Sequence, residues 1–315
     1  MLIERELYIE KIKASYQLLP VTVLIGCRQV GKTSLLNLIR VNLDHVFLNG
    51  QDPDVAIVFE SVPNAEAFLR VNLNERFAGF VIIDEFQYLN NISTFIKILT
   101  DKHPDLKFIC SGSSSLDILQ NVNESLAGRV RIIEIFSLSW PEYILFNDKE
   151  LYQKFLKCDK DENLLLIDSR FAPIFSEYLL FGGFPRLAAI RGHEEKINLL
   201  NDIYVTYLLK DVRAYIRNQD SIGFNKMLRM LSLQIGNMIN VNELSNKSGL
   251  PYKKAEEYLW LLEQMYIIKL VEPYTTNKRK SLSKMKKMYF TDTGLRNIIA
   301  GNFNDMAFRN DSGSI

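Results

Sequence analysis

Short apolar runs alternate with stretches of helical spacing over the first half of the chain. The apolar runs occupy residues 21–25, 45–48, 80–84, 106–110 and 130–136. Runs of this length predict strands, and those rich in large aliphatic residues predict strands buried on both faces of a parallel sheet. Because helical stretches separate the runs, we predict an α/β core with a doubly wound parallel sheet over residues 1–148.

Beyond residue 148 the pattern changes. Residues 149–219 have helical spacing and no clear strand, which predicts a helical lid. Residues 220–300 predict a winged-helix domain, because three helical stretches come before two extended runs. The helical stretches are 224–235, 241–250 and 251–265, and the extended runs are 267–271 and 287–291. Residues 301–315 are predicted to be a tail or the start of a further domain.

The first apolar run leads directly into a phosphate-binding motif. Residues 26–33 follow the pattern G-x-x-x-x-G-K-[ST] of a P-loop, between a predicted strand and a predicted helix. Its glycines permit close approach of backbone N–H groups to phosphates, Lys32 supplies a cation for the β- and γ-phosphates, and the Thr33 hydroxyl can ligate Mg²⁺. The predicted nucleotide-binding residues are Gly26, Cys27, Arg28, Gln29, Val30, Gly31, Lys32, Thr33 and Ser34.

The third apolar run ends in two acids. Asp84 is placed to hold Mg²⁺, and Glu85 is placed to polarise an attacking water, because ligands of open α/β sheets bind at the carboxyl ends of strands. Two solvated acids at a strand end are the alternative. An Asp-Glu pair favours an ATPase over a small-molecule kinase. ATP is favoured over GTP, because the Asn-Lys pairs at 246–247 and 277–278 lack the Asp of a guanine-reading element.

Two further residues are candidates for the reaction. Ser111 follows the fourth run and could sense the γ-phosphate, although Ser-Gly-Ser is also an ordinary turn sequence. Arg129 comes just before the fifth run and could stabilise charge in the transition state, either in cis or across a subunit boundary of a homo-oligomer. A surface arginine is the alternative for Arg129.

The predicted winged helix carries basic residues where such modules contact double-stranded DNA. Lys253 and Lys254 begin the recognition helix, and the wing contributes Lys278, Arg279 and Lys280. The same helix carries Glu256, Glu257 and Glu263, which repel phosphates. Docking of a protein partner is therefore an equal alternative.

Composition narrows the class of protein. Among 315 residues, 47% are hydrophobic and 24% are charged, as in ordinary globular domains. A net charge of +1 excludes a global field that would recruit nucleic acid or a membrane. Cys27, Cys110 and Cys158 are isolated, which indicates reduced thiols. With no signal peptide and no membrane-spanning apolar run in the sequence, we expect a cytoplasmic protein without a membrane partner.

Several motifs together resemble the AAA-type ATPases of bacteria and archaea. They are Gly-x-Arg-Gln-Val-Gly-Lys-Thr, Ile-Ile-Asp-Glu-Phe-Gln, Ser-Gly-Ser-Ser-Ser, Ser-Leu-Ala-Gly-Arg, Leu-Leu-Phe-Gly-Gly-Phe-Pro-Arg and Tyr-Phe-Thr-Asp-Thr-Gly-Leu. The set is most similar to an uncharacterised branch with a C-terminal domain of unknown function. The resemblance implies that Ser111 lies in a sensor strand and that Pro185 packs on the nucleotide. Cys27 stands where members commonly have proline. Members usually continue with a further domain after a segment that resembles residues 307–315, so we expect the given sequence to be without that last domain.

We therefore expect Mg²⁺-dependent binding and hydrolysis of ATP by a molecular switch, in which the core is coupled to the winged helix. The alternative is a nucleotide-sensing regulator that binds DNA or docks on a protein and has little turnover.

Overall fold

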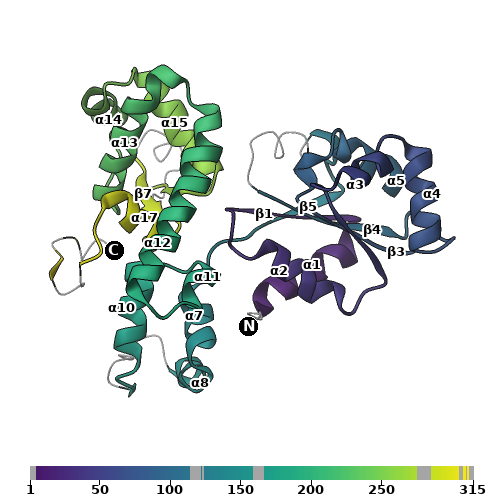
Figure 1. The fold of residues 1–315 in the computed structure, drawn as a ribbon, viewed down its shortest axis with the longest axis horizontal. Coiled ribbons are helices and arrows are strands. Elements are labelled where there is room, and N and C mark those ends of the chain that lie inside the picture. Colours follow the sequence, from purple (N-terminus) through teal and green to yellow (C-terminus); the bar gives the residue numbers. More distant parts are fainter. Residues whose placement is uncertain are drawn as a thin grey trace. The chain divides into compact units, whose positions relative to one another are not determined.

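The computed structural model describes residues 5–113, 122, 124–158, 167–274, 285–304, 308, 309 and 311, without the side chains of 208–211 and 214. The chain forms two compact units, residues 1–135 and residues 136–315 (Figure 1). Each unit is described by itself. In the described residues, no helix has the length and apolarity that crossing a membrane requires.

The N-terminal unit contains the predicted parallel sheet. Its strands are β1 (Val21–Gly26), β2 (His45–Asn49), β3 (Gly79–Asp84), β4 (Leu106–Ser113) and β5 (Val130–Glu134). They lie in the order β2-β3-β4-β1-β5, and all neighbours are parallel. All six residues of β1 are buried, which explains why this strand consists almost entirely of apolar residues. The order puts the ends of β1, β4 and β3 side by side.

Helices cover both faces of this sheet. They are α1 (Glu6–Leu18), α2 (Lys32–Arg40), α3 (Pro53–Val58), α4 (Val62–Asn72), the 3₁₀ turn η1 (Phe86–Tyr88) and α5 (Ile92–Lys102). Figure 1 shows α1 and α2 on one face and α3, α4 and α5 on the other. The predicted doubly wound α/β core is therefore confirmed.

The C-terminal unit begins with helices. They are α7 (Trp140–Asn147), α8 (Lys149–Lys157), α10 (Phe171–Phe181), α11 (Pro185–Ala188), α12 (His193–Ile203), the π-helical η2 (Tyr204–Val212) and the 3₁₀ turns η3 (Arg213–Tyr215) and η4 (Asn218–Asp220). The centroids of the Tyr143 ring in α7 and the Tyr178 ring in α10 are 5.0 Å apart. Helix α7 thus packs inside this unit, whereas the boundary predicted at residue 148 assigned it to the core.

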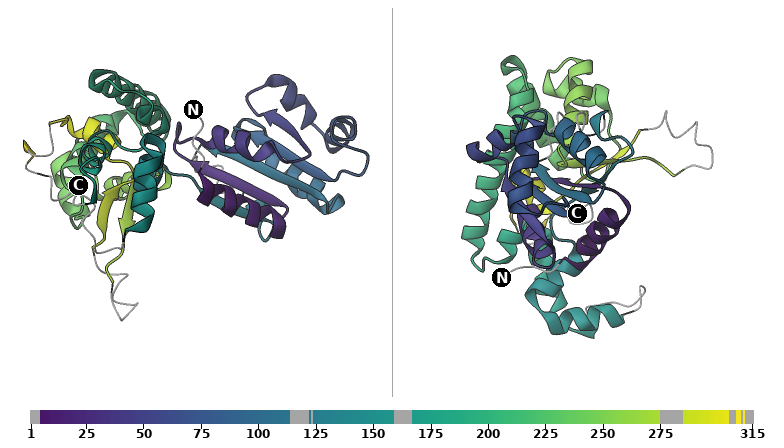
Figure 2. Two further views of the ribbon diagram at one scale, coloured as in Figure 1. Left: turned by 90° about the horizontal axis from the view of Figure 1, so that it is seen from below. Right: turned by 90° about the vertical axis from the view of Figure 1, so that its right-hand side faces the viewer.

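The rest of the unit follows the predicted order of three helices and a hairpin. The elements are α13 (Ser221–Leu233), α14 (Val241–Ser248), α15 (Tyr252–Gln264), β6 (Ile268–Val271), β7 (Lys287–Phe290) and α17 (Thr293–Ala300). Strands β6 and β7 pair antiparallel and lie beside the helices (Figure 2). Residues 275–284, which include the predicted DNA contacts Lys278, Arg279 and Lys280, lie outside the described residues.

Two motifs separated by about a hundred residues meet in this unit. The carboxylate of Asp292 accepts a hydrogen bond from Leu295 N (3.0 Å), and Asp292 thereby caps the N-terminus of α17. The same carboxylate accepts a second hydrogen bond from Gly183 N (2.9 Å). Gly182 has φ +77°, and a Cβ there would lie 2.0 Å from Asp292 Oδ1. Burial raises the pKa of Asp292, while its backbone N–H partners act in the opposite direction. Asp292 therefore joins the end of α10 to the start of α17.

Candidate nucleotide-binding site

The loop after β1 has a backbone conformation that favours glycine at two positions, Gly26 and Gly31. A Cβ on Gly26 would lie 2.0 Å from the carbonyl oxygen of Ile135, so no larger residue fits there. Gly31 has φ +96° and stands at the N-cap of α2. Gln29 is also left-handed, with φ +63°. The loop thereby turns into the N-terminus of α2, where backbone N–H groups favour anions such as phosphates.

Lys32 is folded back onto the loop. Its Nζ donates to the carbonyl oxygens of Gly26 (2.9 Å) and Cys27 (2.7 Å). The side chain is buried, and this burial lowers the pKa of Lys32, while the charge of Glu85 acts in the opposite direction. Cys27 contributes its backbone carbonyl to this arrangement.

Asp84 joins the ends of three elements. Its Oδ2 accepts from the Thr33 hydroxyl of α2 at 2.7 Å, and its Oδ1 accepts from the Ser111 hydroxyl of β4. All three are hard oxygen groups, which Mg²⁺ prefers. Among the described residues, no group of three or more His, Cys, Asp or Glu could hold a metal ion. The Thr33–Asp84 pair suits an ion that is held mainly by phosphates and waters, as Mg²⁺ usually is.

Glu85 follows Asp84 in a left-handed conformation (φ +53°). Gly50 makes room for it, because a Cβ on Gly50 would lie 2.5 Å from the Glu85 carbonyl oxygen. The side chain of Gln87 donates to the Glu85 carboxylate and to Ser113 Oγ (3.0 Å). A Cβ on Gly112 would lie 2.8 Å from Gln87 Oε1. The amide is thus closely held between Glu85 and the end of β4.

Gln87 is a site residue that the sequence analysis did not single out. A lone glutamine carries no chemical signal of its own. Its position two residues after Glu85, inside the Asp-Glu-Phe-Gln motif, is the signal that could have identified it.

Arg129 lies at the N-terminal end of the parallel strands, opposite to the end that carries the phosphate loop. Its carbonyl oxygen accepts from Val21 N (3.2 Å) at the start of β1, whereas the phosphate loop follows the end of β1, about 17 Å away along the strand. The guanidinium group makes two hydrogen bonds to Asp101, at 2.9 and 3.2 Å. In this structure Arg129 thus lies away from the phosphate loop, which leaves its predicted role in cis without support. The role across a subunit boundary stays a prediction.

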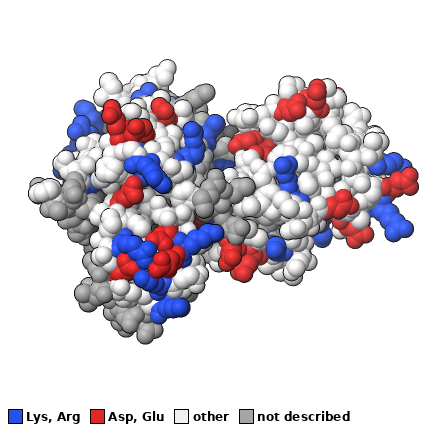
Figure 3. Space-filling model, turned by 60° about the horizontal axis from the view of Figure 1, so that its bottom comes forward, with Lys and Arg blue, Asp and Glu red and all other residues white. Residues whose placement is uncertain are grey.

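Pro185 begins α11 in the C-terminal unit. Its packing on a nucleotide would need contact between the two units and stays a prediction. The predicted DNA contacts that are described lie on α15. There Lys253 is exposed, whereas Lys254 pairs with Glu257 at 2.6 Å. Figure 3 shows basic and acidic side chains interspersed on the face in view rather than a single basic field.

Residues 19–144 match the sequence profile of a family described as AAA domain. Together with the five-stranded parallel sheet, this match supports the fold of a P-loop NTPase. The Walker-type ATPase PABY2304 of Pyrococcus abyssi superposes with a TM-score of 0.60 at 15% identity, covering 94% of this chain and 95% of that chain. At this identity the likeness concerns the fold alone.

The C-terminal unit and the curated relatives add no activity. Residues 172–306 match a domain of unknown function, DUF8612. Uncharacterised protein Rv2008c of Mycobacterium tuberculosis is 23% identical over 302 residues, which is 96% of this chain and 60% of that protein. Uncharacterised protein MJ1544 of Methanocaldococcus jannaschii is 25% identical over 283 residues, with 86% and 60% covered. The chain thus spans about 60% of the length of these relatives.

Proposed function

We propose that the N-terminal unit binds ATP with Mg²⁺ and hydrolyses its terminal phosphoanhydride bond. The observation that carries this proposal is the convergence of Thr33, Asp84 and Ser111 beside the phosphate loop. Asp84 ends β3, and Ser111 lies near the end of β4, which separates β3 from β1. The acid and the phosphate loop therefore share the carboxyl-end edge of the sheet. AAA-type P-loop domains use this edge for a nucleotide triphosphate.

Each residue has a defined task in this proposal. The backbone N–H groups at the start of α2 bind phosphate oxygens, and Lys32 exchanges its two carbonyl partners for the β- and γ-phosphates. Thr33 and Asp84 hold Mg²⁺, which when bound supplies positive charge to the phosphate oxygens. Glu85 orients the attacking water and accepts hydrogen bonds from it. Gln87 and Ser113 hold Glu85 in position.

Calorimetric titration of ATP with and without Mg²⁺ tests this proposal. Asp84→Ala should remove the enhancement of ATP binding by Mg²⁺, because it removes the carboxylate beside Thr33. Asp105→Ala is the matched control, since Asp105 is an exposed acid at the opposite edge of the sheet. An Asp84→Ala protein that keeps the full Mg²⁺ effect would contradict the metal assignment.

The second candidate is a nucleotide-responsive regulator with little turnover. The contact between Gln87 and the Glu85 carboxylate favours it, because an acid that already accepts an amide N–H is partly occupied. Gln87→Ala distinguishes the two roles by steady-state phosphate release. A rise above the parent rate indicates that Gln87 restrains Glu85, and a fall indicates that Gln87 positions Glu85 for water.

Coupling between the ATPase unit and the C-terminal unit belongs to the same proposal. We infer that nucleotide state is passed to the module of α13, α14, α15 and the β6–β7 hairpin, which has the element order of a winged helix. DNA binding by this module is the weaker alternative, because Lys254 is already paired with Glu257.

A further inference from the structure

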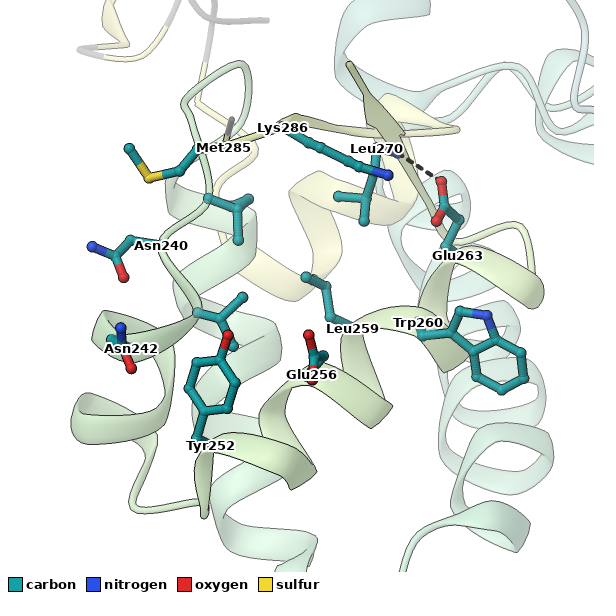
Figure 4. Close-up of a pocket in the computed structure, with 12 residues that line it drawn as sticks. Asn240, Asn242, Tyr252, Glu256, Leu259, Trp260, Glu263, Leu270, Met285 and Lys286 are labelled. Atoms are coloured by element: carbon teal, nitrogen blue, oxygen red, sulfur yellow. Dashed lines mark hydrogen bonds between the residues drawn. The ribbon is translucent and has the colours of Figure 1, made fainter. Parts of the chain in front are cut away.

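The C-terminal unit contains a groove of about 590 Å³ between the start of α14, helix α15 and the β6–β7 hairpin (Figure 4). We call it the α15 groove. Its apolar lining includes Tyr252, Leu259 and Trp260 from α15 and Leu270 from β6. Two acids of the same helix, Glu256 and Glu263, also line the groove. The groove lies in one unit, so it depends on no arrangement of the two units.

The aromatic side chains of the groove are about half exposed. Trp260 is 49% exposed and Tyr252 is 45% exposed. Positions 252, 256 and 260 are spaced by four residues, so Tyr252, Glu256 and Trp260 follow one another along one face of the helix. Large aromatic side chains gain most from burial by a partner and dominate binding energy at protein interfaces. An accessible tryptophan beside a groove therefore indicates a contact surface.

The charge of the groove is acidic. Glu256 takes part in no ion pair with another described residue. Glu263 accepts a hydrogen bond from Leu270 N (3.0 Å), which fixes its carboxylate at the end of the groove (Figure 4). Lys286 also lines the groove, but its ammonium group pairs with Glu272 at 3.2 Å. Among the charged side chains of the described lining, Glu256 is thus the one whose carboxylate has no partner and is open to a cation from outside.

We propose that the α15 groove binds an extended segment of a partner protein that carries apolar side chains and a lysine or arginine. The apolar side chains cover Leu259, Leu270 and Trp260, and the cation pairs with the Glu256 carboxylate. An ion pair of this kind is a charge-assisted hydrogen bond, which fixes the register of the segment. The proposal does not depend on ATP hydrolysis.

Duplex DNA fits the groove poorly. Phosphates would approach Glu256 and Glu263, and both carboxylates would repel them. The proposal therefore favours a protein partner at this groove and specifies the chemistry of that partner.

An array of synthetic 12-residue peptides tests the proposal, with the number of Lys or Arg and of Leu, Ile or Met varied independently. The whole chain should retain peptides that contain both classes above peptides that contain either class alone. The strongest peptide is then titrated in solution against a Trp140→Phe background, which leaves Trp260 as the single tryptophan. Its binding should change the Trp260 fluorescence.

Charge reversal gives the sharpest comparison. Glu256→Lys should weaken the strongest peptide about tenfold or more, because it places like charges together. Glu257→Lys is the matched control, since it makes the same charge change on the same helix outside the groove lining, and it should change the affinity less than about threefold. ATP affinity, measured in parallel, should stay at the parent value in both variants, so that a failure here is separate from a failure of the ATPase proposal.

A 20-base-pair duplex is the second probe. The two ligands predict opposite signs, because Glu256→Lys should strengthen DNA binding while it weakens peptide binding. The proposal is overturned if no class of peptide is enriched, or if both charge reversals affect the peptide equally. It is also overturned if the parent chain binds the duplex and Trp260→Ala abolishes that binding.

Discussion

At the scale of single residues, the carbonyl oxygens of Gly26 and Cys27 hold the ammonium group of Lys32 against the loop that we propose binds the phosphates. We predict that Lys32→Ala weakens ATP about tenfold to a hundredfold, since a hydrogen bond to a charged group contributes about 1.5–3 kcal/mol. Calorimetric titration measures this loss. Lys13→Ala, an exposed lysine of α1, serves as the control and should bind ATP like the parent. Equal affinity in both variants would contradict the phosphate-loop assignment.

Lys32 also predicts a proton linkage. Burial lowers its pKa, so between this lowered pKa and the unfolded-state pKa of about 10.4 the nucleotide-free protein holds fewer protons at this site than the unfolded chain does. Phosphates favour the charged form and raise the pKa again, so ATP binding takes up protons and weakens as pH rises through the lowered pKa. Titrations between pH 7 and 10 in buffers of different ionisation enthalpy measure this uptake.

The control for the proton linkage is Lys32→Arg. Arginine stays charged throughout this pH range, so the uptake of protons should disappear while part of the ATP affinity remains. Proton release by the parent protein on ATP binding would contradict the explanation.

At the scale of elements, the sequence predicted best the strands that are buried on both faces of the sheet. Strands β1 and β3 are found within a few residues of their predicted bounds, because an unbroken apolar run such as 21–25 fits only a strand covered on both faces. The site followed from the same logic, since Asp84 ends such a run. Domain boundaries depend on contacts between distant residues. The assignment of α7 to the C-terminal unit rests on contacts such as Tyr143 with Tyr178, which no local pattern encodes.

Contacts between distant residues also explain what the sequence could not reveal about single side chains. Gln87 gains its place from Ser113, which lies 26 positions later, and Arg129 is separated from the phosphate loop by the length of β1. The spacing of Gln87 and Ser113 in the sequence does not indicate that they are in contact. The spacing of Arg129 from the loop likewise does not show whether Arg129 lies near the site or on an ordinary part of the surface.

The junction of α10 and α17 gives a prediction at this scale. Asp292→Ala should lower the free energy of unfolding by about 1–3 kcal/mol, because Leu295 N and Gly183 N both lose their acceptor in a buried place. Asp292→Asn should have an intermediate effect, since an amide offers one acceptor oxygen where two N–H groups need one each. Urea unfolding followed by tryptophan fluorescence measures this, and both tryptophans lie in the C-terminal unit.

The matched control is Asp148→Ala. Asp148 caps α8 by accepting from Leu151 N (2.9 Å), but its side chain is 24% exposed, so water can replace part of what is lost. If Asp292→Ala is no more destabilising than Asp148→Ala, the junction does not have the importance assigned to it.

At the scale of the whole molecule, Arg129 tests whether active sites are shared between copies of the chain. If Arg129 acts across a subunit boundary, the specific activity of the parent protein should rise with protein concentration. Arg129→Ala should then bind ATP but hydrolyse it slowly at every concentration. Phosphate release over a wide range of concentrations measures both effects.

The partner of Arg129 provides the control for that experiment. Asp101→Ala removes the ion pair with Arg129 but keeps the guanidinium group, so a role across the boundary predicts that its activity is retained. Loss of a surface ion pair changes the free energy of unfolding little, so the Asp101→Ala protein should remain folded. Full activity of Arg129→Ala, with a concentration-independent rate in the parent, would reduce Arg129 to such a pair.

The central claim is that residues at the ends of β1, β3 and β4 form a site that hydrolyses Mg²⁺-ATP. Single-turnover phosphate release from Glu85→Gln, combined with calorimetric ATP binding, tests it most directly. The amide keeps the shape of Glu85 but loses the charge that orients water. We predict parent-like ATP affinity with hydrolysis slower by about 10²–10⁴-fold. Hydrolysis at the parent rate in this variant, or no ATP-dependent phosphate release by the parent protein, would contradict the claim.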